Sequence, residues 1–153
     1  MPRLLPALIF AFGATVSPAL YAVDMEEQPG ATALDPDYAA GRKAIEARDW
    51  NTAIKSFSTA ALRSPDNADI QNYLGFANRK IGQLDPALKH YRRALELNPR
   101  HRGAHEYIGE AYLMDGKPEM AEQHLLALEK ICSQGCEEYT DLAKAMAAYK
   151  AAR

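Results

Sequence analysis

The sequence predicts an all-α protein built from helical hairpins that stack one on another. Three observations lead to this fold class. A pattern of small and apolar residues recurs at a fixed interval, each copy contains two stretches in which apolar residues have helical spacing, and glycine or proline separates the stretches. A hairpin of this size cannot bury its apolar face alone, so neighbouring copies must cover it.

The 34-residue period is visible in three phrases of the sequence. AIKSFSTAALRSPDN begins at Ala53, ALKHYRRALELNPRH at Ala87 and AEQHLLALEKICSQG at Ala121, and the interval between these alanines is the repeat length. The other positions that keep this register are Gly41, Gly75 and Gly109; Ala40, Leu74 and Ile108; Phe57, Tyr91 and Leu125; and Ala60, Ala94 and Leu128. Three copies in one register predict three successive hairpins.

Each hairpin is expected to hold two antiparallel helices, as the second copy illustrates. Apolar residues between Ile70 and Ile81 share one helical face, and Gly82 ends this helix. A second helix is expected from about Asp85 to Leu97, because Pro99 cannot continue it. A small residue such as Gly75 lets the two helices approach closely.

These hairpins resemble the tetratricopeptide repeat, abbreviated TPR. The resemblance is carried by Gly41, Ala53, Phe57, Ala60 and Pro65 in the first copy; by Leu74, Gly75, Ala87, Tyr91, Ala94 and Pro99 in the second; and by Gly109, Tyr112 and Ala121 in the third. The third copy departs from the pattern at Leu128 and Ser133. The resemblance implies a right-handed α-solenoid of three TPR hairpins, at about residues 34–67, 68–101 and 102–133.

A capping helix is expected after the third hairpin, over residues 137–152. A stacked array leaves its last apolar face bare, and a terminal element must cover it. Apolar residues recur here at helical spacing, namely Tyr139, Leu142, Ala145, Met146 and Tyr149. Acidic residues at its start and basic residues at its end suit the helix dipole.

Residues 1–22 have the layout of a secretory signal peptide. Arg3 is followed by an apolar stretch from Leu4 to Val16 and then by small residues that end at Ala22. We expect cleavage after Ala22, export to the periplasm, and a flexible acidic linker over residues 23–34. The alternative is an uncleaved anchor helix, but the apolar stretch is shorter than the ~20 residues that a membrane-spanning helix needs. The mature chain, which lacks this stretch, is expected to have no membrane span.

The amino-acid composition and the absence of certain motifs argue against two classes of function, nucleic-acid binding and catalysis. The 153 residues carry 18 Lys plus Arg against 20 Asp plus Glu, a formal charge of −2. This balance argues against nucleic-acid binding. The sequence has no glycine-rich phosphate loop and no Gly-x-Ser-x-Gly nucleophile elbow, so we expect a protein that is not an enzyme and needs no cofactor.

Cys132 and Cys136 lie between the last repeat helix and the expected cap. In an oxidising compartment they can persist as a disulfide bond, which would pin the capping helix. A redox-active thiol pair and a metal site stay open as alternatives. The Cys-x-x-x-Cys ending also resembles that of small exported bacterial TPR proteins.

The four histidines offer a weaker metal hypothesis. His101 and His105 are four positions apart and could share a helix face, which is a usable metal spacing. The alternative for His105 is a partly buried structural role. His90 and His124 occupy equivalent positions of successive repeats, which predicts a shared surface location rather than a site. No metal site is therefore expected.

The resemblance implies that the first helix of each hairpin lines a concave groove. Repeat-equivalent positions that differ between copies would point into it, and the candidate partner-binding residues are Tyr38, Arg42, Asn72, Tyr73, Phe76, Lys80, Glu106, Tyr107 and Glu110. Aromatic and arginine side chains are common binding hot spots. The alternative is that Tyr73, Phe76 and Tyr107 belong to the core between repeats.

The expected function is a protein–protein interaction module or scaffold that binds a segment of a partner protein in this groove. Two alternatives stay open. One is a redox or metal-handling assembly factor that uses Cys132 and Cys136. The other is a self-associating scaffold, such as a homodimer, because three repeats are close to the minimum for stability.

Overall fold

A computed structural model describes residues 35–133 and 135–152 of the chain. The predicted signal peptide and linker, residues 1–34, lie outside the described residues. All regular structure in the described part is helical, which confirms the all-α prediction. None of the helices described is both long and apolar enough to cross a membrane.

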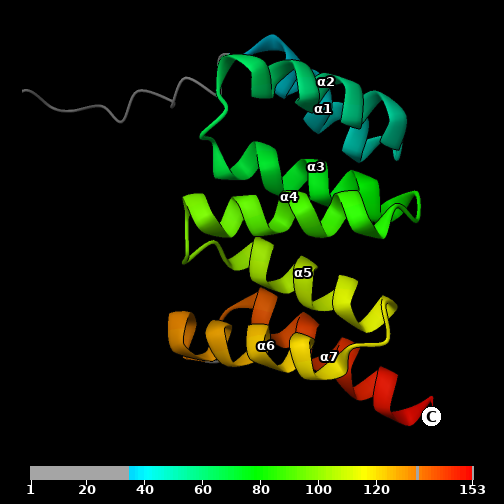
Figure 1. The fold of residues 1–153 in the computed structure, drawn as a ribbon, viewed down its shortest axis with the longest axis vertical. Coiled ribbons are helices and arrows are strands. Elements are labelled where there is room, and N and C mark those ends of the chain that lie inside the picture. Colours follow the sequence, from blue (N-terminus) through cyan, green and yellow to red (C-terminus); the bar gives the residue numbers. More distant parts are fainter. Residues whose placement is uncertain (1–34, 134, 153) are drawn as a thin grey trace, which may run out of the picture.

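In this described part, seven helices follow one another as three hairpins and a closing helix (Figure 1). They are α1 (Pro36–Glu46), α2 (Trp50–Arg63), α3 (Ala68–Lys80), α4 (Leu84–Leu97), α5 (Arg102–Met114), α6 (Pro118–Cys132) and α7 (Glu137–Ala151). Each helix packs on the next, and α5 also contacts α3 and α7. The helix expected from Asp85 begins one residue earlier, and the cap expected over 137–152 ends one residue earlier.

The turn inside each hairpin needs one residue in the left-handed region. Gly82 and Gly116 adopt φ angles of 79° and 72° there, and Arg48 adopts 56° at the equivalent position of the first hairpin. Successive members of this set are one repeat length apart. Glycine takes this conformation without a steric penalty, whereas arginine does not. The first turn is therefore the strained member of the set.

Close helix approach depends on a glycine in each first helix. A Cβ atom at Gly41 would lie 2.8 Å from the Phe57 ring, and one at Gly75 would lie 2.6 Å from the Tyr91 ring. The third glycine, Gly109, meets Leu142 of α7 instead, at 2.7 Å. The capping helix thus fills the space that an aromatic ring of the same hairpin fills in the first two repeats.

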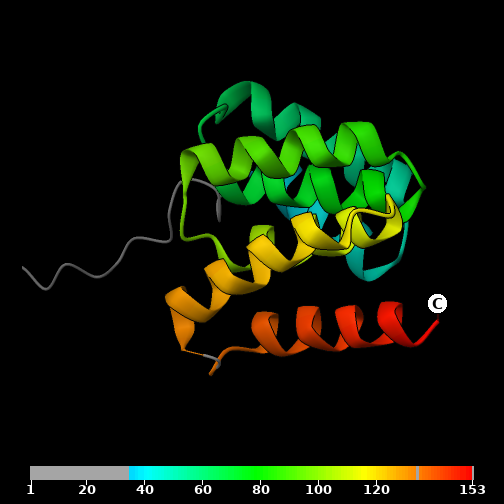
Figure 2. The ribbon, with the colours of Figure 1, turned by 60° about the horizontal axis from the view of Figure 1, so that its bottom comes forward.

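Two apolar clusters form the core. One joins α1, α2 and α3 around Phe57 and Ile70. The other joins α4 to α7, and its fully buried side chains include Tyr91, Ile108, Leu128 and Leu142. Figure 2 shows α7 running alongside the last hairpin. Burial of Leu142 and Met146 in this second cluster confirms that α7 closes the stack.

Candidate functional site

Three cavities follow one another along the surface formed by α1, α3, α5 and α7, which we call the groove face. The acidic pocket, of about 350 Å³, lies between the N-terminal halves of α3, α5 and α7. The central pocket, of about 470 Å³, lies between the C-terminal halves of the same three helices. The first-repeat pocket, of about 520 Å³, lies where the end of α1 and the start of α2 meet α3.

Aromatic rings link the repeats beneath the groove face. Tyr73 stacks on the buried Phe57 with a centroid distance of 4.9 Å, and the Tyr38 ring packs edge-on against both. In the next repeat, Phe76 contacts Tyr107 at 5.0 Å. All of these rings except Phe57 are half-buried. They support the stacking of the repeats, and Tyr73, Phe76 and Tyr107 also line the cavities.

Arg79 is a buried cation at the centre of this face. Its side chain is 8% exposed, and Nη1 lies 2.6 Å from a carboxylate oxygen of Glu110. Its Nε donates to the hydroxyl of Tyr91 at 3.3 Å. The guanidinium carbon also lies 5.6 Å from the Phe76 ring centre and 5.5 Å from that of Tyr107. Arg79 therefore ties α3 to both α4 and α5.

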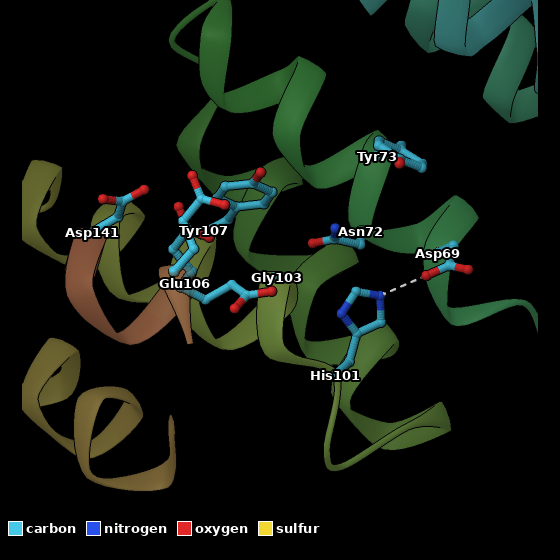
Figure 3. A pocket seen from close by; sticks show the side chains of 10 residues that line it. Asp69, Asn72, Tyr73, His101, Gly103, Glu106, Tyr107 and Asp141 are labelled. Carbon is cyan, nitrogen blue, oxygen red and sulfur yellow. Dashed lines mark hydrogen bonds and ion pairs between the residues drawn. The ribbon is translucent and has the colours of Figure 1, made fainter. Parts of the chain in front are cut away.

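The acidic pocket gathers carboxylates from three helices. Its walls carry five of them, namely Asp69, Glu106, Glu137, Glu138 and Asp141. The basic side chain in its lining is His101, whose Nε2 lies 2.9 Å from Asp69 (Figure 3). Asn72 and Gly103 complete the wall between these groups.

Among the carboxyl groups of the acidic pocket, Glu106 has the most strongly shifted pKa. Burial is the main cause that raises its pKa to about 8, and the negative charges of Glu110, Asp141 and Glu138 add to it, while Arg79 acts in the opposite direction. Burial disfavours the ionised carboxylate, and like charges nearby disfavour it further. A carboxyl group of this kind changes its charge near neutral pH.

Seven of the nine residues predicted for the groove line the three cavities. Asn72, Tyr73, Glu106 and Tyr107 line the acidic pocket, Lys80 and Glu110 line the central pocket, and Phe76 and Lys80 line the first-repeat pocket. The other two lie on α1. The Tyr38 ring packs on Tyr73, and the guanidinium of Arg42 lies 5.2 Å from the centre of the same ring.

Sequence reasoning missed Arg79 and the acidic residues of α7. One signal for Arg79 was present, because its repeat-equivalents, Ile45 and Leu113, are both apolar. A signal for Glu138 and Asp141 was also present. Leu142 follows Ile108 by one repeat length, so the repeat register continues into α7 and places its first turns beside those of α5.

The histidines do not form the spacing-based metal site. His101 caps α5 by accepting from the Ala104 amide, while His105 is buried and turned toward α6. His105 Nε2 lies 3.0 Å from the Pro99 carbonyl, and its Nδ1 lies 3.0 Å from His124 Nδ1. The structural alternative for His105 is confirmed. Within the part of the chain that the structure describes, no three His, Cys, Asp or Glu side chains are arranged to hold a metal ion.

His90 and His124 share an equivalent location, as predicted, but it is half-buried between the two helices of a hairpin rather than on the open surface. Both side chains are half-buried, and each contacts the first helix of its own hairpin. His90 Nδ1 lies 2.9 Å from Gln71 Oε1, just as His124 contacts His105. Gln71 and His105 are themselves repeat-equivalent, so the pair is a repeated interhelical contact.

The sulfur atoms of Cys132 and Cys136 lie 2.08 Å apart, which is disulfide-bonding distance. This geometry agrees with the predicted disulfide bond. Cys136 is buried and immediately precedes α7, so the bond joins the end of α6 to the start of the capping helix.

Comparisons with known proteins agree with this architecture. The family model of the tetratricopeptide repeat matches residues 68–101. The TPR2B domain of yeast Sti1, in its pHsp70 complex, has a TM-score of 0.70 at 17% identity, over 76% of this chain and 95% of that one.

Two further solved structures have similar folds. The second TPR domain of human RPAP3, in complex with the HSP70 peptide SGPTIEEVD, has a TM-score of 0.67 at 18% identity, over 78% of this chain and 95% of that one. The Yersinia enterocolitica type III secretion translocator chaperone SycD has a TM-score of 0.71 at 18% identity, over 78% and 93%. Residues 68–101 match the tetratricopeptide repeat model, and the described chain has the all-α solenoid fold of TPR domains.

Proposed function

We propose that this chain is a non-enzymatic protein-interaction module that binds an extended segment of a partner protein along the groove face. The observation that carries the proposal is the row of three cavities across α1, α3, α5 and α7, lined by half-buried rings and by charges of both signs. Clefts that combine aromatic contact area with a few placed polar groups are typical binding sites.

The solved neighbours support this type of function. Two of them are TPR domains in complexes with pHsp70 or an HSP70 peptide, and a third is a translocator chaperone. The chemistry of this groove differs from what the HSP70 peptide SGPTIEEVD would need. That peptide ends in acidic residues, whereas the acidic pocket of this chain would repel them. We therefore propose a different peptide for this chain.

A peptide selection tests the proposal directly. The immobilised protein is used to select binders from a random peptide library displayed on phage, and the dissociation constants of the selected peptides are measured by calorimetry. We expect the Phe76→Ala, Tyr107→Ala double variant to weaken binding at least about tenfold, as for loss of hot-spot rings.

The matched control removes two apolar side chains from the opposite, outer surface. Leu62 on α2 and Leu126 on α6 are 84% and 50% exposed, and the Leu62→Ala, Leu126→Ala variant should bind as the unmodified protein does. Circular dichroism checks that both variants stay folded. Selected peptides that bind the groove variant at full affinity would refute the groove. If the selection yields no peptide and the molar mass of the protein in light scattering rises with its concentration, the self-associating scaffold would be favoured instead.

We further propose that the protein acts in the periplasm after cleavage behind Ala22. The pairing of Cys132 with Cys136 supports this location, because disulfide bonds persist in oxidising compartments. Mass spectrometry of the protein from a periplasmic extract should find Val23 as the first residue and no free thiol. An uncut chain with two free thiols in the cytoplasm would refute the proposed location.

A further inference from the structure

The acidic pocket has more negative charge than its own cations balance. Asp69 contacts His101 at 2.9 Å, Glu138 contacts Arg102 at 3.5 Å, and Asp141 contacts the exposed Lys144 at 3.2 Å. Glu106 has no ion pair among the described residues, because the nearby Arg79 is held by Glu110 instead. A half-buried carboxylate without a cation is unusual, since the loss of water around it is not compensated.

A second, independent feature of the pocket is an amide oxygen without a donor. Asn72 is 5% exposed, and its Oδ1 is buried with no hydrogen-bond partner among the described residues. In Figure 3 this oxygen points toward the side of the pocket that carries Glu106 and Tyr107. Buried polar atoms normally have partners, so an orphan acceptor at the wall of a cavity indicates a missing donor.

Both features call for the same ligand chemistry. The ionised carboxylates and the Asn72 oxygen accept hydrogen bonds, and Glu106 becomes an acceptor when a bound cation displaces its proton. A ligand that donates several hydrogen bonds and carries positive charge therefore matches both features. A lysine ammonium has three donors and an arginine guanidinium has five. A bound metal ion is a poor fit, because no three acidic or histidine groups in the described part of the chain are arranged to ligate one.

We propose that the acidic pocket receives a lysine or arginine side chain of the partner segment that the groove face binds. The cationic head lies between Glu106, Asp141 and the Asn72 oxygen, and the apolar stem lies against Tyr107 at the pocket wall. This inference rests on the proposed function and names the chemical feature by which the partner is recognised.

The protonation of Glu106 provides a distinct signature. Its pKa of about 8 reflects burial and the charges of Glu110 on α5, of Asp141 and Glu138 on α7, and of Arg79 on α3. A bound cation lowers this pKa, so binding should release a proton from Glu106 near neutral pH. Affinity for the cation should then rise with pH until Glu106 is ionised in the free protein.

The test uses small capped probes and NMR spectroscopy of the ¹⁵N-labelled protein. N-acetyl-lysine methylamide and N-acetyl-arginine methylamide should shift the amide signals of Asn72, Gly103 and Glu106. N-acetyl-norleucine methylamide, which has an apolar stem without the charge, should not shift them. Glycine methylamide carries only an α-ammonium group, so equally strong shifts with it would overturn the assignment to a side chain.

Two isosteric variants make the test specific. Glu106→Gln should weaken the binding of the lysine probe at least about fivefold, as for loss of a charge-assisted hydrogen bond. It should also abolish the increase in affinity between about pH 6.5 and about pH 8.5. Glu122→Gln removes an exposed carboxylate outside the pocket and should change neither.

The outcomes separate this inference from the proposed function. In one outcome, the selected peptides bind through the groove face but are not enriched in lysine or arginine, and the lysine probe binds Glu106→Gln as well as the unmodified protein. This outcome would overturn the cation pocket and leave the proposed function standing. Absence of any groove-dependent peptide would refute the proposed function. A third outcome is that the selected peptides are enriched in lysine or arginine, but replacing such a residue by norleucine weakens binding to Glu106→Gln as much as it weakens binding to the unmodified protein. This outcome would also overturn the pocket assignment.

Discussion

Replacement of Gly75 by alanine tests the close helix approach on which the groove face depends. The added Cβ would lie 2.6 Å from two carbon atoms of the fully buried Tyr91 ring. Carbon atoms in favourable contact are about 3.5–4.0 Å apart, so the ring must move by about 1 Å. Overpacking of this kind costs about 1–3 kcal/mol. The gain in helix propensity on replacing glycine by alanine is about 1 kcal/mol, so we expect a net loss of up to about 2 kcal/mol.

The same replacement should have the opposite sign when Tyr91 is also changed. In Tyr91→Leu the ring is absent, and the third repeat already has leucine at this position, in Leu125. Gly75→Ala should then stabilise the variant by up to about 1 kcal/mol through helix propensity alone. The hydrogen bond between Tyr91 and Arg79 is lost in both members of that comparison, so its contribution cancels.

Urea unfolding followed by circular dichroism measures each free energy of unfolding. Gly103→Ala serves as a steric control, because its Cβ would meet the nearest atom, Asn72 Nδ2, at an ordinary 3.4 Å. If Gly75→Ala changes the free energy by the same amount with Tyr91 and with leucine at position 91, contact with the ring does not limit helix approach. The reasoning would then fail.

Three further predictions concern stability. Burial and the neighbouring His105 lower the pKa of His124 to about 4 from its usual 6.5, so the unfolded chain takes up this proton first as the pH falls below 6.5. The free energy of unfolding should drop by about 1–2 kcal/mol more between pH 7 and pH 5 in the unmodified protein than in His124→Gln; equal drops would contradict this. Arg48→Gly should raise the melting temperature by relieving the left-handed turn, worth about 1 kcal/mol, whereas Gly82→Ala should lower it. Replacing Cys132 and Cys136 by serine should cost about 2 kcal/mol, since their bond closes a short loop, and reducing agent should leave that variant unaffected.

Much of the fold follows from local pattern. The repeat register places Gly75 opposite Tyr91, and the helices end near Gly82 and before Pro99, as predicted. These features depend on neighbours within one hairpin, so periodicity and turn residues are sufficient to predict them. The predicted closing helix is confirmed for the same reason, because its apolar spacing is continuous from Tyr139 to Tyr149.

The candidate site depended on side chains that meet across hairpins. A sequence pattern places Glu106 and Glu110 on one helix, but it does not show that Arg79 pairs with Glu110 and leaves Glu106 without a cation. The pairing of Arg79 with Glu110 depends on the distance between α3 and α5 and on the buried position of the arginine side chain. The histidine pair illustrates the same limit, because His105 and His124 meet only after α5 and α6 pack.

The sequence alone determined that this is a repeat protein with three helical hairpins and a cap, since a periodic pattern can be buried in only one way by stacking. The tertiary structure alone decided which charges remain uncompensated on the groove face. Carboxylates of α5 and α7 are separated along the chain by the whole of α6, and they become one pocket only when α7 packs onto α5. Electrostatic interaction depends on distance in space and on burial, and neither quantity is contained in spacing along the chain.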